Sequence, residues 1–211
     1  LAGRDFTVTG ESEGGFHYKD SSRNITGLKV ALPGAHQMEN SALALRALMI
    51  LTESGFTCTD EELRRGLTNV SWPGRCELVR ESPKVVLDCA HNESAAKALA
   101  STLDEFPRSR LILVIGIMKD KDFRAILAHL APLADKIIFT RADMERSEAP
   151  EKLMESLREF STIEAEVIPT VAMALEGALE EAASGDLVCV TGSVFIVGEA
   201  KAVINLNAQE L

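Results

Sequence analysis

The sequence predicts an α/β protein whose larger, second part is a mostly parallel sheet with helices on both faces. Two observations carry this prediction. From residue 73 onward, short runs of Val, Ile and Leu alternate regularly with longer segments of helical composition, which is the pattern of βαβ units. Several of these apolar runs also stop abruptly at polar residues, as buried strands do where they reach the carboxyl edge of such a sheet.

The expected elements of this second part follow one another with short connections. A hairpin is expected at residues 76–79 and 84–87, and further strands at 111–115, 136–139, 166–168 and 187–190. Helices are expected at about 93–106, 123–130, 150–160, 171–183 and 194–203. The stiff turn W-P-G-R at 72–75 precedes them, and we place a domain boundary there, between domains 1–72 and 73–211.

The first part predicts a small antiparallel sheet followed by two helices. Short β-like pieces within residues 5–32 are separated by the turns G-E-S-E-G-G and K-D-S-S-R-N, and the third piece extends to Leu32. An apolar face predicts a helix at 36–54, which Gly55 should end. Thr59 and Glu62 form a capping-box pattern for a second helix, which we expect to end near Gly66.

Composition restricts the classes of partner. The net charge of −10 argues against a nucleic-acid or membrane surface, and no apolar run approaches the roughly 18 residues of a membrane span. The four cysteines, Cys58, Cys76, Cys89 and Cys189, are widely spaced and form no C-x-x-C pair. We therefore expect a cytoplasmic protein without disulfides, structural zinc, nucleic-acid partner or membrane contact.

Candidate site residues gather where the predicted strands end. Four polar clusters, at residues 88–92, 116–122, 140–141 and 191–193, fall at strand ends or turns of the second part. Ligands of open α/β sheets bind outside the carboxyl ends of the strands, so these clusters predict a ligand site. The chain lacks G-x-x-x-x-G-K-[ST], G-x-G-x-x-G, G-x-S-x-G and H-E-x-x-H, and composition alone indicates only an edge site for an anion or nucleotide.

Each candidate also has a purely structural interpretation. Asp88 is either a helix cap or turn acid, or a carboxylate for a ribose diol. His91 is either a loop residue without a role or an imidazole that hydrogen-bonds substrate. Ser193 is either a helix cap or part of an anion site at a helix N-terminus. Arg75, on its stiff turn, suits phosphate recognition or stacking on a base.

Five motifs in one order extend this reading. They are L-P-G-A-H-Q-M-E-N-S-A-L-A-L, W-P-G-R-C-E, V-L-D-C-A-H-N, G-I-M-K-D-K-D and V-T-G-S-V-F-I-V-G-E. The series resembles the later part of folylpolyglutamate synthase and its bifunctional dihydrofolate synthase relatives, in the Mur ligase superfamily. The resemblance covers residues 27–199.

The resemblance implies an ATP-dependent ligase that activates a folate γ-carboxylate as an acyl phosphate, which the amine of L-glutamate then attacks. Residues 1–72 would be the C-terminal remnant of the central ATP-binding domain, a β-plus-helix tail, and residues 73–211 the Rossmann-like C-terminal domain. The phosphate loop and the Mg²⁺ ligands of this family would lie upstream, in the missing N-terminal ATPase domain. We therefore expect this piece to be inactive alone.

Roles of individual residues also follow from the resemblance. Asn40 matches the asparagine on the adenine side of ATP, and Arg75 and Asp88 match residues that reach the nucleotide, the aspartate at its ribose. His91 matches a histidine near the incoming amino acid that is needed for turnover, and Ser193 matches a serine on the same side.

The D-K-D loop and one departure complete the comparison with the family pattern. Lys119, Asp120 and Asp122 match that loop, to which we assign only a place at the domain cleft. Cys89 stands where the folate enzymes usually have glycine. Another Mur-type amide ligase is the first alternative, although the H-Q-x-x-N and D-K-D motifs favour the folate branch. A stand-alone, non-catalytic nucleotide-binding domain is the second. Whether dihydropteroate is also a substrate stays open.

Overall fold

The computed structural model describes residues 2–11 and 15–207 of the 211-residue chain. These residues form two compact units, Leu1–Trp72 (unit 1) and Pro73–Leu211 (unit 2), and each is described by itself. Both units combine strands with helices, so the predicted α/β class is confirmed. Among the helices of the described residues, none is both long and apolar enough to cross a bilayer.

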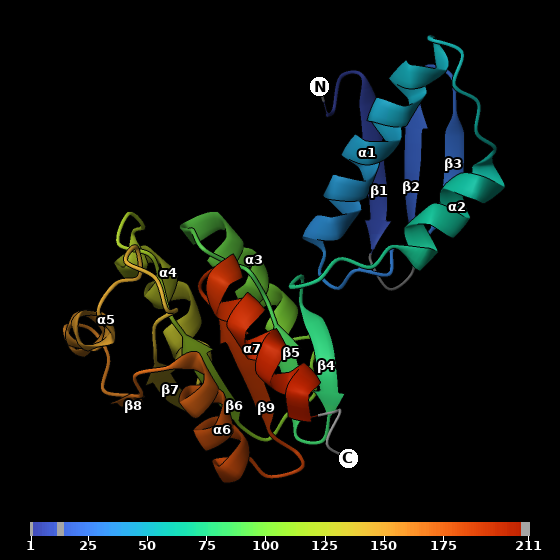
Figure 1. Cartoon of the computed structure of the whole chain (residues 1–211). Helices are drawn as coiled ribbons and strands as arrows, with labels where there is room; N and C mark the ends of the chain where they lie inside the picture. Colours follow the sequence, from blue (N-terminus) through green and yellow to red (C-terminus); the bar gives the residue numbers. More distant parts are fainter. Residues whose placement is uncertain (1, 12–14, 208–211) are drawn as a thin grey trace. The chain divides into compact units, whose positions relative to one another are not determined.

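Unit 1 is a three-stranded antiparallel sheet covered by two helices (Figure 1). The strands β1 (Phe6–Glu11), β2 (Gly15–Asp20) and β3 (Asn24–Leu28) lie in sequence order, and α1 (His36–Thr52) and α2 (Asp60–Asn69) follow. Phe16 and Tyr18 of β2 point into the core while the residues between and after them are more exposed. Of the predicted G-E-S-E-G-G turn, residues 12–14 lie outside the described residues.

Several predicted boundaries in unit 1 differ from the structure, and α1 ends at Thr52 and not at residue 54. The third strand ends at Leu28 and not at Leu32, because the chain beyond it turns to α2, where the Ala31 N–H donates to the Leu67 carbonyl at 3.0 Å. Helix α2 continues through Gly66 to Asn69. An interior glycine costs a helix only about 1 kcal/mol, and the capping box of Thr59 together with apolar packing of α2 outweighs it.

Unit 2 contains a six-stranded sheet in which the last strand of the chain is central. The strand order is β4 (Glu77–Glu81), β5 (Lys84–Leu87), β9 (Leu187–Thr191), β6 (Leu111–Ile115), β7 (Lys136–Phe139) and β8 (Glu164–Val167). The pair β4–β5 is antiparallel, and the other pairs are parallel. The predicted mostly parallel sheet is therefore confirmed.

Helices cover both faces of this sheet, as predicted (Figure 1). On one face, α3 (Glu93–Leu103), α4 (Phe123–Leu130) and α5 (Pro150–Arg158) pack against alternate strand residues such as Leu113 and Ile115. On the other face, α6 (Val171–Glu181) and α7 (Val194–Asn207) pack against the intervening residues, such as Val114. Strands buried on both faces read as continuous apolar runs, which explains why the sequence located them.

Several boundaries in unit 2 also differ from the prediction. Strand β4 spans 77–81 and not 76–79, α5 and α6 end at Arg158 and Glu181, β9 ends at Thr191, and α7 continues to Asn207. Strand β8 spans 164–167 and not 166–168, because its two glutamates are held by Lys136, whose Nζ lies 3.4 Å from Glu164 and 2.8 Å from Glu166. Polar residues that pair in this way hide an edge strand from apolar patterning. Helix α3 ends at Leu103 and not near Phe106, where a turn precedes Pro107.

The carboxylate of Asp20 fixes the turn that follows β2. Its Oδ1 accepts the Ser22 and Arg23 N–H groups at 2.7 and 2.8 Å, and its Oδ2 accepts the Tyr18 hydroxyl at 2.8 Å. Arg46 of α1 lies 3.3 Å from the same carboxylate, which is fully buried. Burial alone would raise the pKa of Asp20. The hydrogen bonds lower it by a larger amount, and the pKa is about 2.

We expect Asp20→Asn to lower the free energy of unfolding of unit 1 by about 1–2 kcal/mol at pH 7. Because folding lowers this pKa from 3.8 to about 2, the carboxylate stabilises the fold above pH 4 and loses that effect as the pH falls toward 2. Urea unfolding at several pH values, followed by near-UV circular dichroism of Tyr18, measures the difference. Asp60→Asn, which removes an exposed partner of Arg23, is the control. Equal losses for both variants would contradict this account.

Candidate functional site

Polar residues from three neighbouring strands of unit 2 meet at one edge of the sheet. Strands β5, β9 and β6 are adjacent and parallel, so the residues that follow them leave the sheet on the same side. The Asp88 N–H donates to the Val190 carbonyl at 3.0 Å, and the Gly116 N–H donates to the Thr191 carbonyl at 3.3 Å. The structure therefore brings the predicted clusters 88–92, 116–122 and 191–193 to one edge.

Asp88 connects the loop after β5 to the turn before β4. Its side chain is buried, with the residue only 8% exposed. Oδ1 accepts the Ala90 N–H at 2.8 Å, and Oδ2 accepts the Cys76 N–H at 2.9 Å and the Cys76 thiol at 3.4 Å. Burial, with the Asp88 charge beside it, raises the pKa of the Cys76 thiol and keeps it a donor. A carboxylate has about four acceptor positions, so Asp88 retains capacity for a ligand hydroxyl.

Arg75 is an exposed cation on a backbone that is held on both sides. Among the described residues its guanidinium has no hydrogen-bond or ion-pair partner. The preceding Gly74 accepts the Cys89 N–H at 2.9 Å, and the following Cys76 is bound to Asp88. Cys76 has a φ of 44°, a left-handed conformation that is uncommon for a residue with a side chain. The arrangement leaves a free positive charge on a fixed turn.

His91 presents one ring nitrogen to solvent. Its Nδ1 lies 2.9 Å from the Cys89 carbonyl, and because a carbonyl only accepts, Nδ1 carries the proton. In the neutral form of the exposed ring, Nε2 then holds a free lone pair. The neighbouring Asn92 caps α3 by accepting the Ala95 N–H at 2.9 Å. The helix-cap interpretation of Asp88 is therefore wrong, and that role belongs to Asn92.

Ser193 caps α7. Its Oγ accepts the Ile196 N–H at 3.2 Å, and the residue is 3% exposed. The preceding Gly192 has a φ of 107°, which allows the chain to turn sharply from β9 into the helix. The structural interpretation of Ser193 is thus confirmed, and its place on the amino-acid side stays a prediction.

The D-K-D loop after β6 is tied to the segment 145–146. Lys119 Nζ donates to the Glu145 carbonyl at 2.6 Å, and Asp120 lies 3.3 Å from Arg146. Asp122 caps α4 with its Oδ1. All three predicted residues therefore have local structural roles at the ligand edge, and their role at a domain cleft is untested by these contacts.

Asn40 is the predicted site residue that belongs to unit 1. It is exposed on α1, and its amide donates to Gln37 Oε1 at 3.1 Å. The other predicted site residues all belong to unit 2. The contact of Asn40 with adenine therefore stays a prediction.

The departure at Cys89 is accommodated within unit 2. The residue is 9% exposed, and its sulfur lies so close to Gly74 that a Cβ there would meet it at 2.6 Å. Within residues 2–11 and 15–207, Cys76 is the one non-glycine residue with a positive φ, so the backbone at 89 does not require glycine. Cys89 fills space against Gly74 and α7.

Three buried hydroxyls lie beside the loop after β6, and the sequence analysis missed one of them, that of Ser147. Within the described part of the chain, Thr140, Ser147 and Thr191 each have a buried side-chain oxygen without a partner. Ser147 pairs with Met118 through an isolated bridge. Thr140 follows β7 and Thr191 ends β9, so both belong to the predicted polar clusters, whereas nothing in the sequence marks Ser147.

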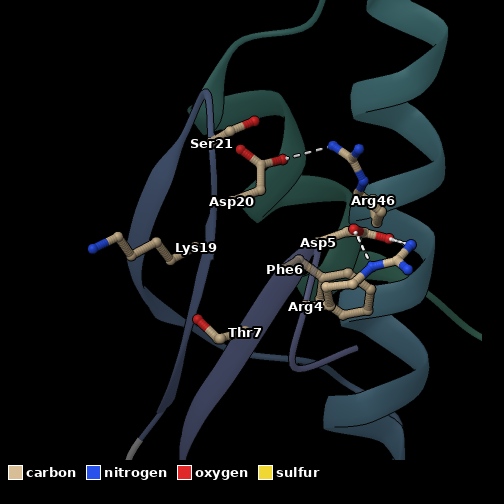
Figure 2. Close-up of a pocket in the computed structure, with 8 residues that line it drawn as sticks. All are labelled: Arg4, Asp5, Phe6, Thr7, Lys19, Asp20, Ser21 and Arg46. Atoms are coloured by element: carbon tan, nitrogen blue, oxygen red, sulfur yellow. Dashed lines mark hydrogen bonds and ion pairs between the residues drawn. The ribbon is translucent and has the colours of Figure 1, made fainter. Parts of the chain in front are cut away.

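Unit 1 contains a hollow of about 520 Å³ beside β1 and α1 (Figure 2). Figure 2 shows Arg4 directed at Asp5 and Arg46 directed at Asp20. The N–O distances of these pairs are 2.9 and 3.3 Å. No predicted site residue lines this hollow, and its two arginines already have carboxylate partners. We therefore place the candidate site at the strand edge of unit 2.

Comparison with known proteins identifies the family. The family model described as "Mur ligase, glutamate ligase domain" matches residues 74–194, which is more than half of the chain and lies within unit 2. The chain belongs to this Mur ligase family. The resemblance predicted from the five motifs is thereby confirmed.

Similar proteins are named for folate chemistry. A probable bifunctional folylpolyglutamate synthase/dihydropteroate synthase of Halobacterium salinarum is 36% identical over 95% of this chain and 24% of its own length. The structure of E. coli FolC in complex with DHPP and ADP matches with a TM-score of 0.87 and 29% identity, over 98% of this chain and 47% of that one.

A further structure is that of a bifunctional folylpolyglutamate synthase/dihydrofolate synthase from Yersinia pestis, complexed with AMPPNP and Mn ion. It matches with a TM-score of 0.81 and 29% identity, over 97% of this chain and 46% of that one. The chain thus spans between about a quarter and half of the length of the relatives it matches.

Proposed function

We propose that this chain is the C-terminal part of an ATP-dependent ligase that adds L-glutamate to a folate. The observation that carries the proposal is the strand edge of unit 2, where an unpaired Arg75, a buried Asp88 and a His91 with a free Nε2 lie on segments joined by hydrogen bonds. Membership of a glutamate ligase family supports this assignment. In such a reaction ATP supplies the phosphoryl group that makes a carboxylate reactive toward an amine.

The nucleotide side of the site is assigned to Arg75 and Asp88. A free guanidinium on a fixed turn suits a phosphate, because it binds oxygen pairs through parallel N–H donors. Asp88 has acceptor capacity left for a ribose hydroxyl. We further propose that Asn40 contacts the adenine side. In its favour, its amide is exposed on α1 and accessible to a ligand.

The amino-acid side is assigned to His91 and Ser193. A glutamate α-amine must lose a proton before or as it attacks, and Nε2 of His91 is an exposed acceptor for that N–H. The Ser193 oxygen accepts the Ile196 N–H in capping α7, and its O–H remains available to donate. For Lys119, Asp120 and Asp122 we propose only a place at the domain cleft of the full-length protein.

A divalent metal has no evident site in the described parts of either unit. Within these residues no group of three or more His, Cys, Asp or Glu side chains could hold a metal ion. We therefore derive no step through Mg²⁺ from this chain, and propose that its ligands belong to the N-terminal ATPase domain of the same protein. A relative's structure with AMPPNP and Mn ion supports a metal-dependent family reaction.

Unit 1 we propose to be the C-terminal part of the central ATP-binding domain. Helix α1 packs one face on the sheet, yet Leu43, Ile50 and Leu51 on its outer side are 50–56% exposed. A helix that is apolar all round is normally covered all round. The apolar outer face of α1 supports the proposal that another element of a larger domain packs against this helix.

The proposal is tested with the full-length protein that contains this chain. Incubation with ATP, Mg²⁺, tetrahydrofolate and labelled glutamate should give a folate lengthened by glutamate, with one ADP released for each bond. ADP release that requires an amino acid but not a folate would favour another Mur-type amide ligase. ATP binding without any amide product would favour a non-catalytic nucleotide-binding domain. Either result overturns the proposed activity.

His91→Ala is expected to lower kcat of this reaction by about 100-fold or more, the usual contribution of a positioned base. The KM for ATP should change little, because Nε2 is assigned to the amine and not to the nucleotide. Steady-state kinetics with glutamate and with ATP varied in turn measure both effects. His129→Ala, at a histidine on α4 beside Glu93, is the control. Normal turnover of the His91 variant would remove this role.

A further inference from the structure

The turn that contains Arg75 is stabilised by an ion pair between two residues that lie far apart in the sequence. Glu77, at the start of β4, accepts the Gly74 N–H on its Oε2 at 2.9 Å. Its Oε1 accepts a hydrogen bond from Lys201 Nζ, on α7, at 2.5 Å. Both side chains are partly buried, with exposures of 26% for Glu77 and 32% for Lys201.

Backbone groups on both sides of Arg75 are therefore occupied. Gly74 donates to Glu77 and accepts from the Cys89 N–H, while Cys76 donates to Asp88. Two carboxylates thus hold the turn from opposite sides. The Asp88 carboxylate is buried, so its surroundings hold it in place. The Glu77 side chain is only partly buried, and Lys201 is the residue that holds its Oε1.

We propose that Lys201 is a positioning residue for Arg75. By holding Glu77 against the Gly74 N–H, it keeps the turn in the conformation that directs the guanidinium to the nucleotide. Because Lys201 lies on the helix that Ser193 begins, the same contact ties the nucleotide side of the site to the helix on its amino-acid side. The inference rests on the proposed function, because it assigns Arg75 to ATP.

The physical reason is conformational entropy. A lysine or glutamate side chain that is not held samples many rotamers, and fixing one costs up to about 2 kcal/mol. Without Lys201, Glu77 turns to solvent and the Gly74 N–H loses its partner. ATP must then order the turn on binding. The apparent affinity for ATP is therefore lowered in proportion to the fraction of molecules in which the turn is already ordered.

The experiment measures the KM for ATP, the KM for glutamate and kcat in the full-length protein. Lys201→Met should raise the KM for ATP by about 3- to 10-fold and leave the KM for glutamate unchanged, and Lys201→Arg should restore it. Glu77→Gln keeps an acceptor for the Gly74 N–H but loses the charge, so it should show an effect in the same direction. Lys152→Met is the matched control, since it removes a comparable ion pair, with Glu148, on α5.

A double-mutant cycle with Arg75→Ala separates the two claims. If Lys201 acts through Arg75, Lys201→Met has no further effect on the KM for ATP once Arg75 is alanine. Additive effects, or an unchanged KM in both Lys201→Met and Glu77→Gln, overturn the positioning role and leave the proposed function intact. An unchanged KM for ATP in Arg75→Ala itself overturns the ATP assignment and with it the inference.

Discussion

Replacing Gly192 by alanine is expected to lower the free energy of unfolding of unit 2 by about 3 kcal/mol or more. The φ of 107° at Gly192 is one that residues with a side chain rarely adopt. A Cβ built there would lie 2.3 Å from the Gly116 carbonyl oxygen and 2.9 Å from its carbon, so the strain is accompanied by a clash with backbone. Backbone cannot rotate away as a side-chain end does.

Chemical unfolding followed by far-UV circular dichroism measures this loss. Gly198→Ala is the matched control, because Gly198 is an exposed residue of α7 where a Cβ would meet nothing within 4 Å. That variant should gain about 0.5–1 kcal/mol from the higher helix propensity of alanine. A Gly192→Ala protein as stable as the wild type would mean that β9 and β6 do not approach each other as described.

Asp88→Ala is expected to have two effects of different kinds. It leaves the Cys76 and Ala90 N–H groups buried without their acceptor, at a cost of about 1–3 kcal/mol each. It also frees one side of the Arg75 turn and removes the carboxylate assigned to ribose, so the KM for ATP should rise by about 10-fold or more. Thermal unfolding and ATP kinetics of the same preparation measure both effects.

Asp88→Asn separates these contributions. The asparagine oxygen can serve one of the two backbone donors but not both, so its stability should lie between those of the wild type and the alanine variant. Cys76→Ala keeps the backbone N–H and loses only the thiol contact, and it should be less damaging than Asp88→Ala. Native stability in Asp88→Ala would contradict the hydrogen bonds on which the description of this turn depends.

The fold could largely be predicted because unit 2 buries its strands on both faces. Both Leu111–Ile115 and Leu187–Thr191 are wholly buried, and they are apolar except for the terminal threonine of the second, which makes each a clear run between helices. The edge strand β8 was displaced in the prediction because half of its residues are glutamates that serve Lys136. Ion pairs of this kind depend on residues that are neighbours in space and not in sequence.

The site was predictable where its residues are close in sequence to a strand end. Asp88 and His91 follow β5 directly, and the parallel arrangement then brings β9 and β6 beside them. The contact between Glu77 and Lys201 joins residues 124 positions apart, and neither residue lies in a pattern that indicates the other. The choice of Asn92 over Asp88 as the cap of α3 likewise depends on one turn of backbone that composition does not determine.

The central place of β9 has a consequence for how the protein is made. During synthesis β5 and β6 leave the ribosome long before the strand that lies between them, so both wait with unpaired edges. Exposed strand edges are where nascent chains misassociate, and parallel pairing of distant segments is slow. The T-G-S turn comes with this last strand, so the ligand edge exists only in chains that have been translated nearly to residue 193. A chain that ends before residue 187 therefore lacks both the central strand and the T-G-S turn.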